Sequence, residues 1–199
     1  MSQRQSDPET EAELLAAYAA GEPAAARALA QSLAPLVYAH AVRMLNDRAE
    51  AEDVAQEAML RLWRQAAGWD AQGAASVRTW LYRVTANLCI DRLRKTRPAG
   101  LPEDSEMADG KPGAEALLQA RDRQMALEEA LMHLPDRQRQ AVVLRHIDGL
   151  GNPEIARIMD IGPRAVESLT ARGKRALTAR LSGQRENLGY MDDTVETSS

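Results

Sequence analysis

The chain has 199 residues and a formal net charge of −4, from 25 Lys and Arg against 29 Asp and Glu. Apolar residues make up 45% of it, which is enough for one ordinary domain or two small ones. No apolar run reaches the roughly 18 residues of a membrane span, which excludes membrane insertion. The acidic balance argues against a protein that coats nucleic acid indiscriminately.

Signals of cellular location point to the cytoplasm. Cys89 is the single cysteine, so no internal disulfide can form. Its place near the apolar face of a predicted helix indicates a packed, inert thiol. The polar, acidic start of the chain lacks the basic and apolar segments of a signal peptide. We therefore expect a cytoplasmic protein, and its abundant Ala, Leu, Arg, Glu and Gln favour helices.

Helices are predicted from the start of the chain. A first helix begins near Pro8, a residue favoured at the first helical position. Pro35 interrupts the apolar pattern of residues 22–45, which therefore form either two helices or one kinked helix.

Two further helices follow in the first half. Residues 46–69 begin with a capping box formed by Asp47 and Glu50. A Gly- and Ala-rich loop at 70–76 then precedes a helix over 77–95.

A change of composition divides the chain. Residues 98–114 hold three Pro and three Gly among acidic and small residues, which predicts a flexible, acidic linker. The tail at 182–199 is similar and predicted to be disordered. Between them, helices are expected over residues 113–134, 135–149 and 152–159 and from Pro163 onward.

The last two of these helices have helix-turn-helix spacing. Asn152-Pro153 and Gly162-Pro163 each place an N-cap residue before a proline, and only Asp160 and Ile161 lie between the helices. One face of the second helix is predicted to be buried, with Val166, Leu169, Gly173 and Ala176 on it. Other faces are free to meet a ligand and carry Arg164, Glu167, Ser168, Arg172 and Arg175.

Basic residues gather in two places. Residues 78–97 hold six Lys or Arg and one acidic residue, Asp91. Residues 164–180 hold five Lys or Arg and one acidic residue, Glu167. Each group alone is compatible with an ordinary solvated helix face.

Signals for catalysis are missing. His40, His133 and His146 are scattered without partners at metal-ligand spacing, and no glycine-rich phosphate-binding motif occurs. We therefore predict no enzymatic activity, no metal, no cofactor and no small-molecule substrate.

Three blocks of sequence, taken together, resemble bacterial RNA polymerase sigma factors of the extracytoplasmic-function (ECF) group. "AEDVAQEAMLRLW" resembles the helix that docks on the clamp of core RNA polymerase. "RTWLYRVTANLCIDRLRK" is similar to the stretch that melts and reads the −10 promoter element. "LPDRQRQAVVLRHIDGLGNPEIARIMDIGPRAVESLTARGKRAL" resembles the domain that reads the −35 element.

The resemblance implies an all-α protein with two small helical domains joined by a flexible linker, the second containing the helix-turn-helix. The implied boundaries are 10–97 for the N-terminal domain, 98–114 for the linker, 115–181 for the C-terminal domain and 182–199 for the tail.

The same resemblance implies three sets of site residues. Binding to core polymerase would use Asp53, Gln56, Glu57 and Arg61. Contacts with the −10 element would use Arg78, Trp80, Tyr82, Arg83, Asn87, Asp91, Arg94 and Lys95. Contacts with the −35 element would use Arg164, Glu167, Ser168, Arg172, Lys174 and Arg175.

Simpler interpretations stay open for several of these residues. Without the resemblance, the acidic face that includes Glu52 and Asp53 is more typical of an ordinary solvated helix surface. Trp80 is at least equally typical of core packing. Glu167 either reads a base or complements the positive helix N-terminus.

Four positions depart from the family's pattern. Asp160 replaces a usual Gly in the turn and Gly162 a frequent Ser, and both substitutes suit those positions. Glu167 replaces a common Lys and Gly173 a common Ala, and we interpret both as affecting promoter sequence rather than fold.

The predicted function is that of an alternative sigma factor. Its implied partners are core RNA polymerase, promoter DNA and an anti-sigma factor, and its implied context is a stress response. A tether of about 18–24 residues reaches roughly 60–80 Å, comparable with the roughly 70 Å of two duplex turns. The alternatives are a stand-alone helix-turn-helix regulator with a sensing or dimerisation domain, and a structural helical adaptor.

Overall fold

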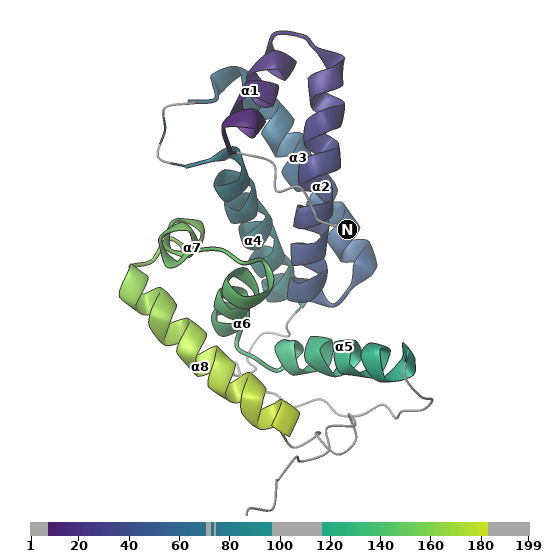
Figure 1. Ribbon diagram of the computed structural model, residues 1–199, viewed down its shortest axis with the longest axis vertical. Helices are drawn as coiled ribbons and strands as arrows, with labels where there is room; N and C mark the ends of the chain where they lie inside the picture. Colours follow the sequence, from purple (N-terminus) through teal and green to yellow (C-terminus); the bar gives the residue numbers. More distant parts are fainter. Residues whose placement is uncertain (1–7, 71–72, 74, 97–116, 183–199) are drawn as a thin grey trace, which may run out of the picture.

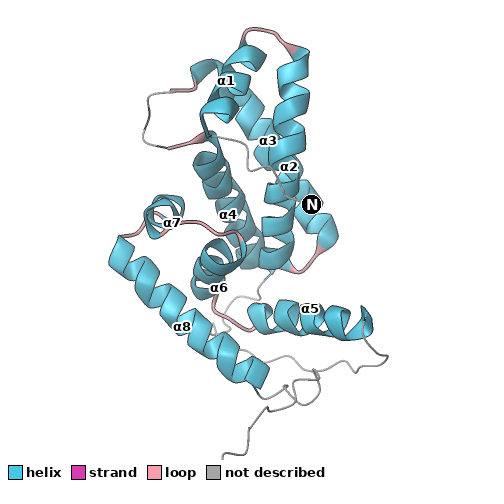
Figure 2. Cartoon of the chain, viewed as in Figure 1, coloured by secondary structure: helices cyan, strands magenta, loops and turns pink. Residues whose placement is uncertain are grey.

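The computed structural model describes residues 8–70, 73, 75–96 and 117–182, and these form helices and loops only (Figure 2). The predicted linker at 98–114 and residues 183–199 of the predicted tail lie outside the described residues. The helices are α1 (Pro8–Ala19), α2 (Pro23–Leu45), α3 (Arg48–Gln65), η1 (Ala66–Gly68), α4 (Val77–Thr96), α5 (Leu117–Met132), α6 (Asp136–Val142), η2 (Val143–Ile147), α7 (Asn152–Met159) and α8 (Pro163–Ser182).

The first half, α1 to α4, is a helical bundle built around α2. Residues 23–45 form one helix with Pro35 inside it, on an exposed position. The helix ends at Asn46, which adopts the left-handed conformation with φ 52°. Asp47 then caps α3 by accepting hydrogen bonds from the backbone N–H groups of Ala49 and Glu50, at 2.9 and 3.1 Å. The predicted start of this helix is confirmed.

The core of this bundle is formed by apolar residues of α1, α2, α3 and α4. Its buried members include Leu15, Leu29, Leu33, Val37, Ala58, Leu62, Val77 and Leu81. Glu50 was predicted to complete a capping box, but its carboxylate instead pairs with Arg92 of α4 and so ties α3 to α4.

The second half contains the predicted helix-turn-helix. After η2, the Asp148 N–H donates to the Val143 carbonyl five residues earlier (2.9 Å), and Gly149 turns the chain with φ 76°. The N-cap of α7 is Gly151 and not Asn152 as predicted, because Asn152 is already helical. Glu154 explains the difference, since its carboxylate accepts the Gly151 N–H at 2.9 Å.

The turn between α7 and α8 matches its prediction. Asp160 is left-handed, with φ 54° and ψ 50°, as a residue replacing glycine there must be. The Gly162 carbonyl accepts from the N–H groups of Ala165 and Val166, at 2.9 and 3.2 Å, and α8 begins at Pro163.

Packing of α8 corrects two predictions. Val166 and Gly173 are buried, but Ala176 is exposed, and Leu177 packs against the core in its place. Gly173 lies so close to α6 that a Cβ there would stand 2.6 Å from Cγ2 of Val142. This residue therefore affects the fold, contrary to the interpretation that it affects promoter sequence alone.

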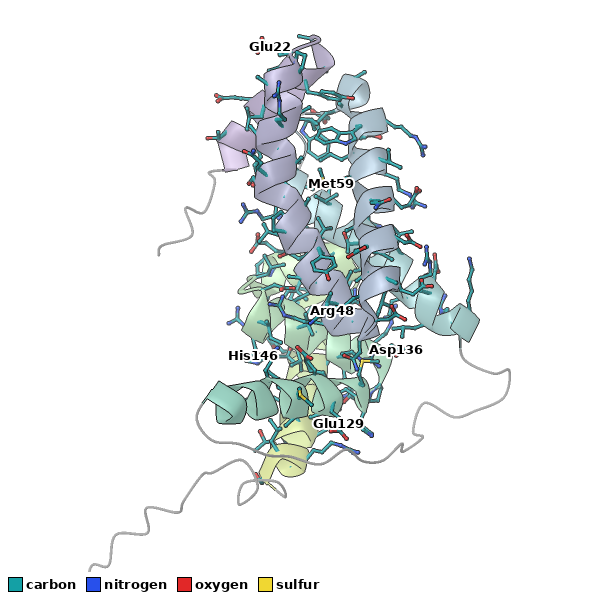
Figure 3. All side chains as sticks on the ribbon, turned by 90° about the vertical axis from the view of Figure 1, so that its right-hand side faces the viewer. Glu22, Arg48, Met59, Glu129, Asp136 and His146 are labelled. Carbon is teal, nitrogen blue, oxygen red and sulfur yellow. The ribbon has the colours of Figure 1, made fainter. Side chains whose placement is uncertain are left out.

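The two halves pack against each other (Figure 1). Two apolar clusters contain residues of both halves, and α5, which carries Glu129, lies across the end of α2 (Figure 3). Arg139 of α6 is buried between the halves, donating to the carbonyl oxygens of Met44 (2.5 Å) and Leu134 (3.3 Å). Within the described residues, no helix combines the length and apolarity that crossing a membrane requires.

Candidate polymerase and nucleic-acid interfaces

Helix α8 presents a basic surface to solvent. Its buried side, centred on Val166 and Gly173, faces the other helices, which leaves the remaining positions outside. All six predicted −35 residues are exposed: Arg164, Glu167, Ser168, Arg172, Lys174 and Arg175. The Arg172 guanidinium Nε donates to the Ser168 carbonyl at 3.3 Å, which holds it along the helix. This face can meet phosphates and base edges.

Five of the eight predicted −10 residues share one face of α4. Four of them recur every four positions and the fifth, Arg94, lies three positions after Asp91, so all fall on one side of the helix. All five are exposed: Arg83, Asn87, Asp91, Arg94 and Lys95. The face is mainly basic, with Asn87 as its neutral hydrogen-bonding group.

The other three predicted −10 residues are engaged inside the protein. Arg78 forms an ion pair with Glu11 of α1 (2.6 Å), whose side chain is fully buried. Burial raises the pKa of Glu11, against the opposing effect of Arg78. Trp80 is half-buried and meets Trp69 edge to face, with the ring centroids 6.1 Å apart.

Tyr82 is the clearest departure from its predicted role. It is only 5% exposed, and its ring stands perpendicular to that of His40 at a centroid distance of 5.4 Å. Burial raises the pKa of its hydroxyl. In this arrangement Tyr82 is therefore not accessible to an unstacked base.

Helix α3 carries the predicted polymerase-binding residues on its outer side. Asp53, Gln56 and Arg61 are exposed and Glu57 is half-buried. The Arg61 Nε donates to the Glu57 carboxylate at 2.8 Å, and this hydrogen bond lowers the pKa of Glu57. The net effect is an acidic face with one internally paired cation.

Leu60 was missed by sequence reasoning and belongs to the same face. It lies seven residues after Asp53 and four after Gln56, and it is 47% exposed. The signal was available, since Leu60 falls off the stripe of Val54, Ala58 and Leu62 that packs inside. Leu60 therefore adds an exposed apolar side chain to this mainly acidic face.

Comparison with known proteins identifies the family of this chain. Residues 29–98 match Sigma-70 region 2, and residues 124–177 match Sigma-70, region 4. The ECF RNA polymerase sigma factor SigW of Bacillus subtilis is 34% identical over 157 residues, covering 73% of this chain and 82% of SigW. The chain belongs to the ECF family of RNA polymerase sigma factors. Members of this family are regulatory DNA-binding proteins rather than enzymes.

A second relative and two solved structures support the assignment of this chain to the ECF sigma factors. SigM of Mycobacterium tuberculosis strain H37Rv is 33% identical over 186 residues, covering 94% of this chain and 88% of SigM. The fold of this chain resembles that of CnrH, which was solved with the cytosolic domain of CnrY. The TM-score is 0.68 and the identity 23%, and the match covers 87% of this chain and 98% of CnrH. The fold also resembles that of Bartonella quintana RpoE, which was solved with the anti-sigma factor NepR. The TM-score is 0.60 and the identity 20%, and the match covers 78% of this chain and 96% of RpoE.

The family regions map onto the three faces. The region 2 match includes all of α3 and α4, and the region 4 match includes α6, α7 and most of α8. The family and the all-α fold inferred from the three sequence blocks are confirmed.

Proposed function

We propose that this sigma factor binds core RNA polymerase through the outer face of α3 and directs it to promoters through α4 and α8. Helix α4 contacts the −10 element and α8 the −35 element. The protein contributes no catalytic group and acts in the cytoplasm, where it works with the polymerase. The observation that carries this proposal is the exposure of all three faces within the two matched regions.

The charges of the three faces support different binding partners for them. Arginine and lysine on α4 and α8 neutralise phosphates and position the protein on DNA. The acidic residues of α3 repel DNA and instead suit a basic protein surface, with Leu60 supplying apolar contact. One molecule thus holds separate surfaces for polymerase and promoter.

An anti-sigma partner is part of the proposal. Its support is the fold shared with RpoE of Bartonella quintana, which was solved with an anti-sigma factor. This partner would hold the protein inactive in unstressed cells and would release it during stress. A pull-down from unstressed cells should recover such a partner, and polymerase as the only stoichiometric partner would contradict it.

Run-off transcription tests the central function. Purified core polymerase and this protein should together transcribe a subset of a promoter library that core alone does not. Arg172→Ala with Arg175→Ala should reduce these transcripts, because both residues are exposed on α8. Arg27→Ala with Arg137→Ala is the matched control, removing two exposed arginines from α2 and α6. Transcripts that do not depend on the protein would refute the proposal.

A further inference from the structure

Helix α4, which we propose contacts the −10 element, is tied to two other helices by ion pairs. Near its start, the Arg78 guanidinium donates to the carboxylate of Glu11 in α1 at 2.6 Å. Fourteen residues further on, Arg92 pairs with Glu50 of α3. A helix rises about 1.5 Å per residue, so the two pairs lie roughly 21 Å apart along α4. Three of the five exposed α4 residues proposed to meet DNA lie between them.

The two ion pairs differ in burial. The side chain of Glu11 is fully buried and that of Arg78 is 20% exposed. The side chains of Arg92 and Glu50 are 32% and 42% exposed. An exposed pair contributes little because water and salt screen it, whereas breaking a buried pair leaves the remaining charge uncompensated. The pair at Glu11 is therefore the firmer attachment of α4.

The position of Arg78 in its helix adds to the need for a carboxylate. Arg78 is the second residue of α4, and the positive end of the helix dipole disfavours a cation there. The first turn of α4 has no acidic residue of its own. Glu11 supplies a negative charge from another helix, so it offsets both the guanidinium and the field of the helix N-terminus.

The same turn carries Trp80, one of the predicted −10 residues. The ring of Trp80 meets that of Trp69 edge to face, and Trp69 directly follows η1. Helix α1 contacts both η1 and α4 (Figure 1). The attachment at Glu11 thus joins α1 to the two segments that hold Trp80 in place.

The family match does not assign this role to α1. The match to Sigma-70 region 2 begins at residue 29, whereas α1 covers Pro8–Ala19. Glu11 was also absent from the predicted site residues, because its partner lies 67 residues later in the chain.

We propose that Glu11 is a positioning residue for recognition of the −10 element. Through Arg78 it fixes the first turn of α4 and so the direction in which the exposed face of α4 meets DNA. The inference rests on the proposed function of α4 and assigns part of that function to α1. Glu11 itself does not contact DNA, because its side chain is fully buried.

Glu11→Gln tests this role, because it keeps the shape of the side chain and removes its charge. The full chain is measured in complex with core polymerase. The probe is a single-stranded oligonucleotide with the −10 element of a promoter found by run-off transcription. Glu11→Gln should lower affinity for this probe by about tenfold. Affinities for core polymerase and for a duplex −35 oligonucleotide should stay within about twofold of the wild type.

The three affinities together distinguish a positioning role from a merely structural one. A general loss of stability would lower all three alike, because each complex draws on the same folded fraction. Glu11→Gln with Arg78→Gln should bind the −10 probe no more weakly than Glu11→Gln, since the uncompensated arginine is gone. Glu13→Gln, at an exposed position of α1, is the matched control and should bind like the wild type.

Two results would overturn the inference. One is wild-type affinity of folded Glu11→Gln for the −10 probe, and the other is an equal loss of all three affinities. If Glu11→Gln loses helicity by circular dichroism, Arg78→Gln breaks the same pair at a partly exposed residue. It should weaken binding of the −10 probe alone, and unchanged binding would contradict the inference equally.

The wild type separates this inference from the proposed function. A wild-type complex that neither transcribes nor binds the −10 probe contradicts the proposed function, and the role of Glu11 falls with it. A wild type that does both, together with a folded Glu11→Gln variant that does both equally well, contradicts the role of Glu11 alone.

Discussion

Gly173 shows how a single residue sets the distance between two helices. An added Cβ would lie 2.6 Å from Cγ2 of Val142 and 3.1 Å from the carbonyl oxygen of Gln138. Neither neighbour yields easily, since Val142 is buried and stiff at χ1 and the oxygen belongs to the backbone. Sequence alone could not reveal this contact, because the opposing atoms lie on α6, more than 30 residues earlier.

We predict that Gly173→Ala lowers the free energy of unfolding by about 1–3 kcal/mol, because α8 must move away from α6. Urea unfolding followed by circular dichroism measures the change. Gly68→Ala is the matched control, since a Cβ there meets only the Gln65 amide nitrogen at an ordinary 3.8 Å. Equal stability of Gly173→Ala and wild type would show that the helices absorb the methyl group.

Glu167 is the acid on the recognition helix, and its position favours a role in reading a base. It is exposed and lies beyond the first turn of α8, where the field of the helix N-terminus fades. A carboxylate repels phosphate but accepts a hydrogen bond from the exocyclic amine of cytosine.

We predict that Glu167→Lys changes the preferred base at one −35 position by about 1–3 kcal/mol. Arg172→Ala should instead weaken all −35 sequences alike if this arginine contacts phosphate. Transcription from a library randomised in the −35 element distinguishes the two patterns. A uniform gain with Glu167→Lys would show that the acid reads no base.

At the scale of elements, most of the fold was predictable because its signals are local. The cap at Asp47, the stripe of α3 and the turn at Asp160 all act within a few residues. One error has a local cause, since Glu154 accepts the Gly151 N–H and so places the N-cap of α7 at Gly151. The other does not, since Glu50 pairs with Arg92 of α4, 42 residues later, and not with its own helix end.

Helix α3 carries the prediction that belongs to this scale. Asp53→Lys with Glu57→Lys should abolish association with core polymerase, because both acids lie on the proposed binding face. The fold should survive, since within the described part of the chain the double substitution removes one ion pair, the partly exposed one between Glu57 and Arg61. Co-purification with core polymerase measures the effect.

Glu13→Lys with Glu22→Lys is the matched control for this experiment. It changes the net charge by the same amount at exposed positions of the α1 and α2 region. The control should bind polymerase like the wild type. Undiminished binding by the α3 variant would remove that face from the interface.

At the scale of the whole molecule, sequence reasoning predicted two helical halves but not their docking. The reason is distance along the chain, since His40 and Asp148, which contact each other across the two halves, are 108 residues apart and neither position carries a local signal. The same docking explains one site residue that differs from expectation, Tyr82, whereas Arg78 and Trp80 are engaged by Glu11 and Trp69 within the first half. Exposed α4 residues were recognisable by helical period, whereas the burial of Tyr82 depends on the second half.

The last prediction concerns free protein and DNA. The net charge is −4 and the basic residues proposed to contact DNA lie on two helices, so few phosphates can be neutralised at once. We predict weak binding of the free protein to duplex promoter DNA, and tight binding only with core polymerase. Fluorescence anisotropy across a salt series measures both.

The salt dependence of the polymerase-bound form tests the individual contacts. Counterion release makes log affinity fall linearly with log salt, with a slope of about −0.9 per neutralised phosphate. Arg175→Ala, at an exposed position of α8, should reduce this slope by about one if Arg175 contacts phosphate. Arg27→Ala, on α2, should leave it unchanged. Tight, sequence-specific binding by the free chain would instead favour a stand-alone regulator, because such a protein needs no polymerase to hold its site.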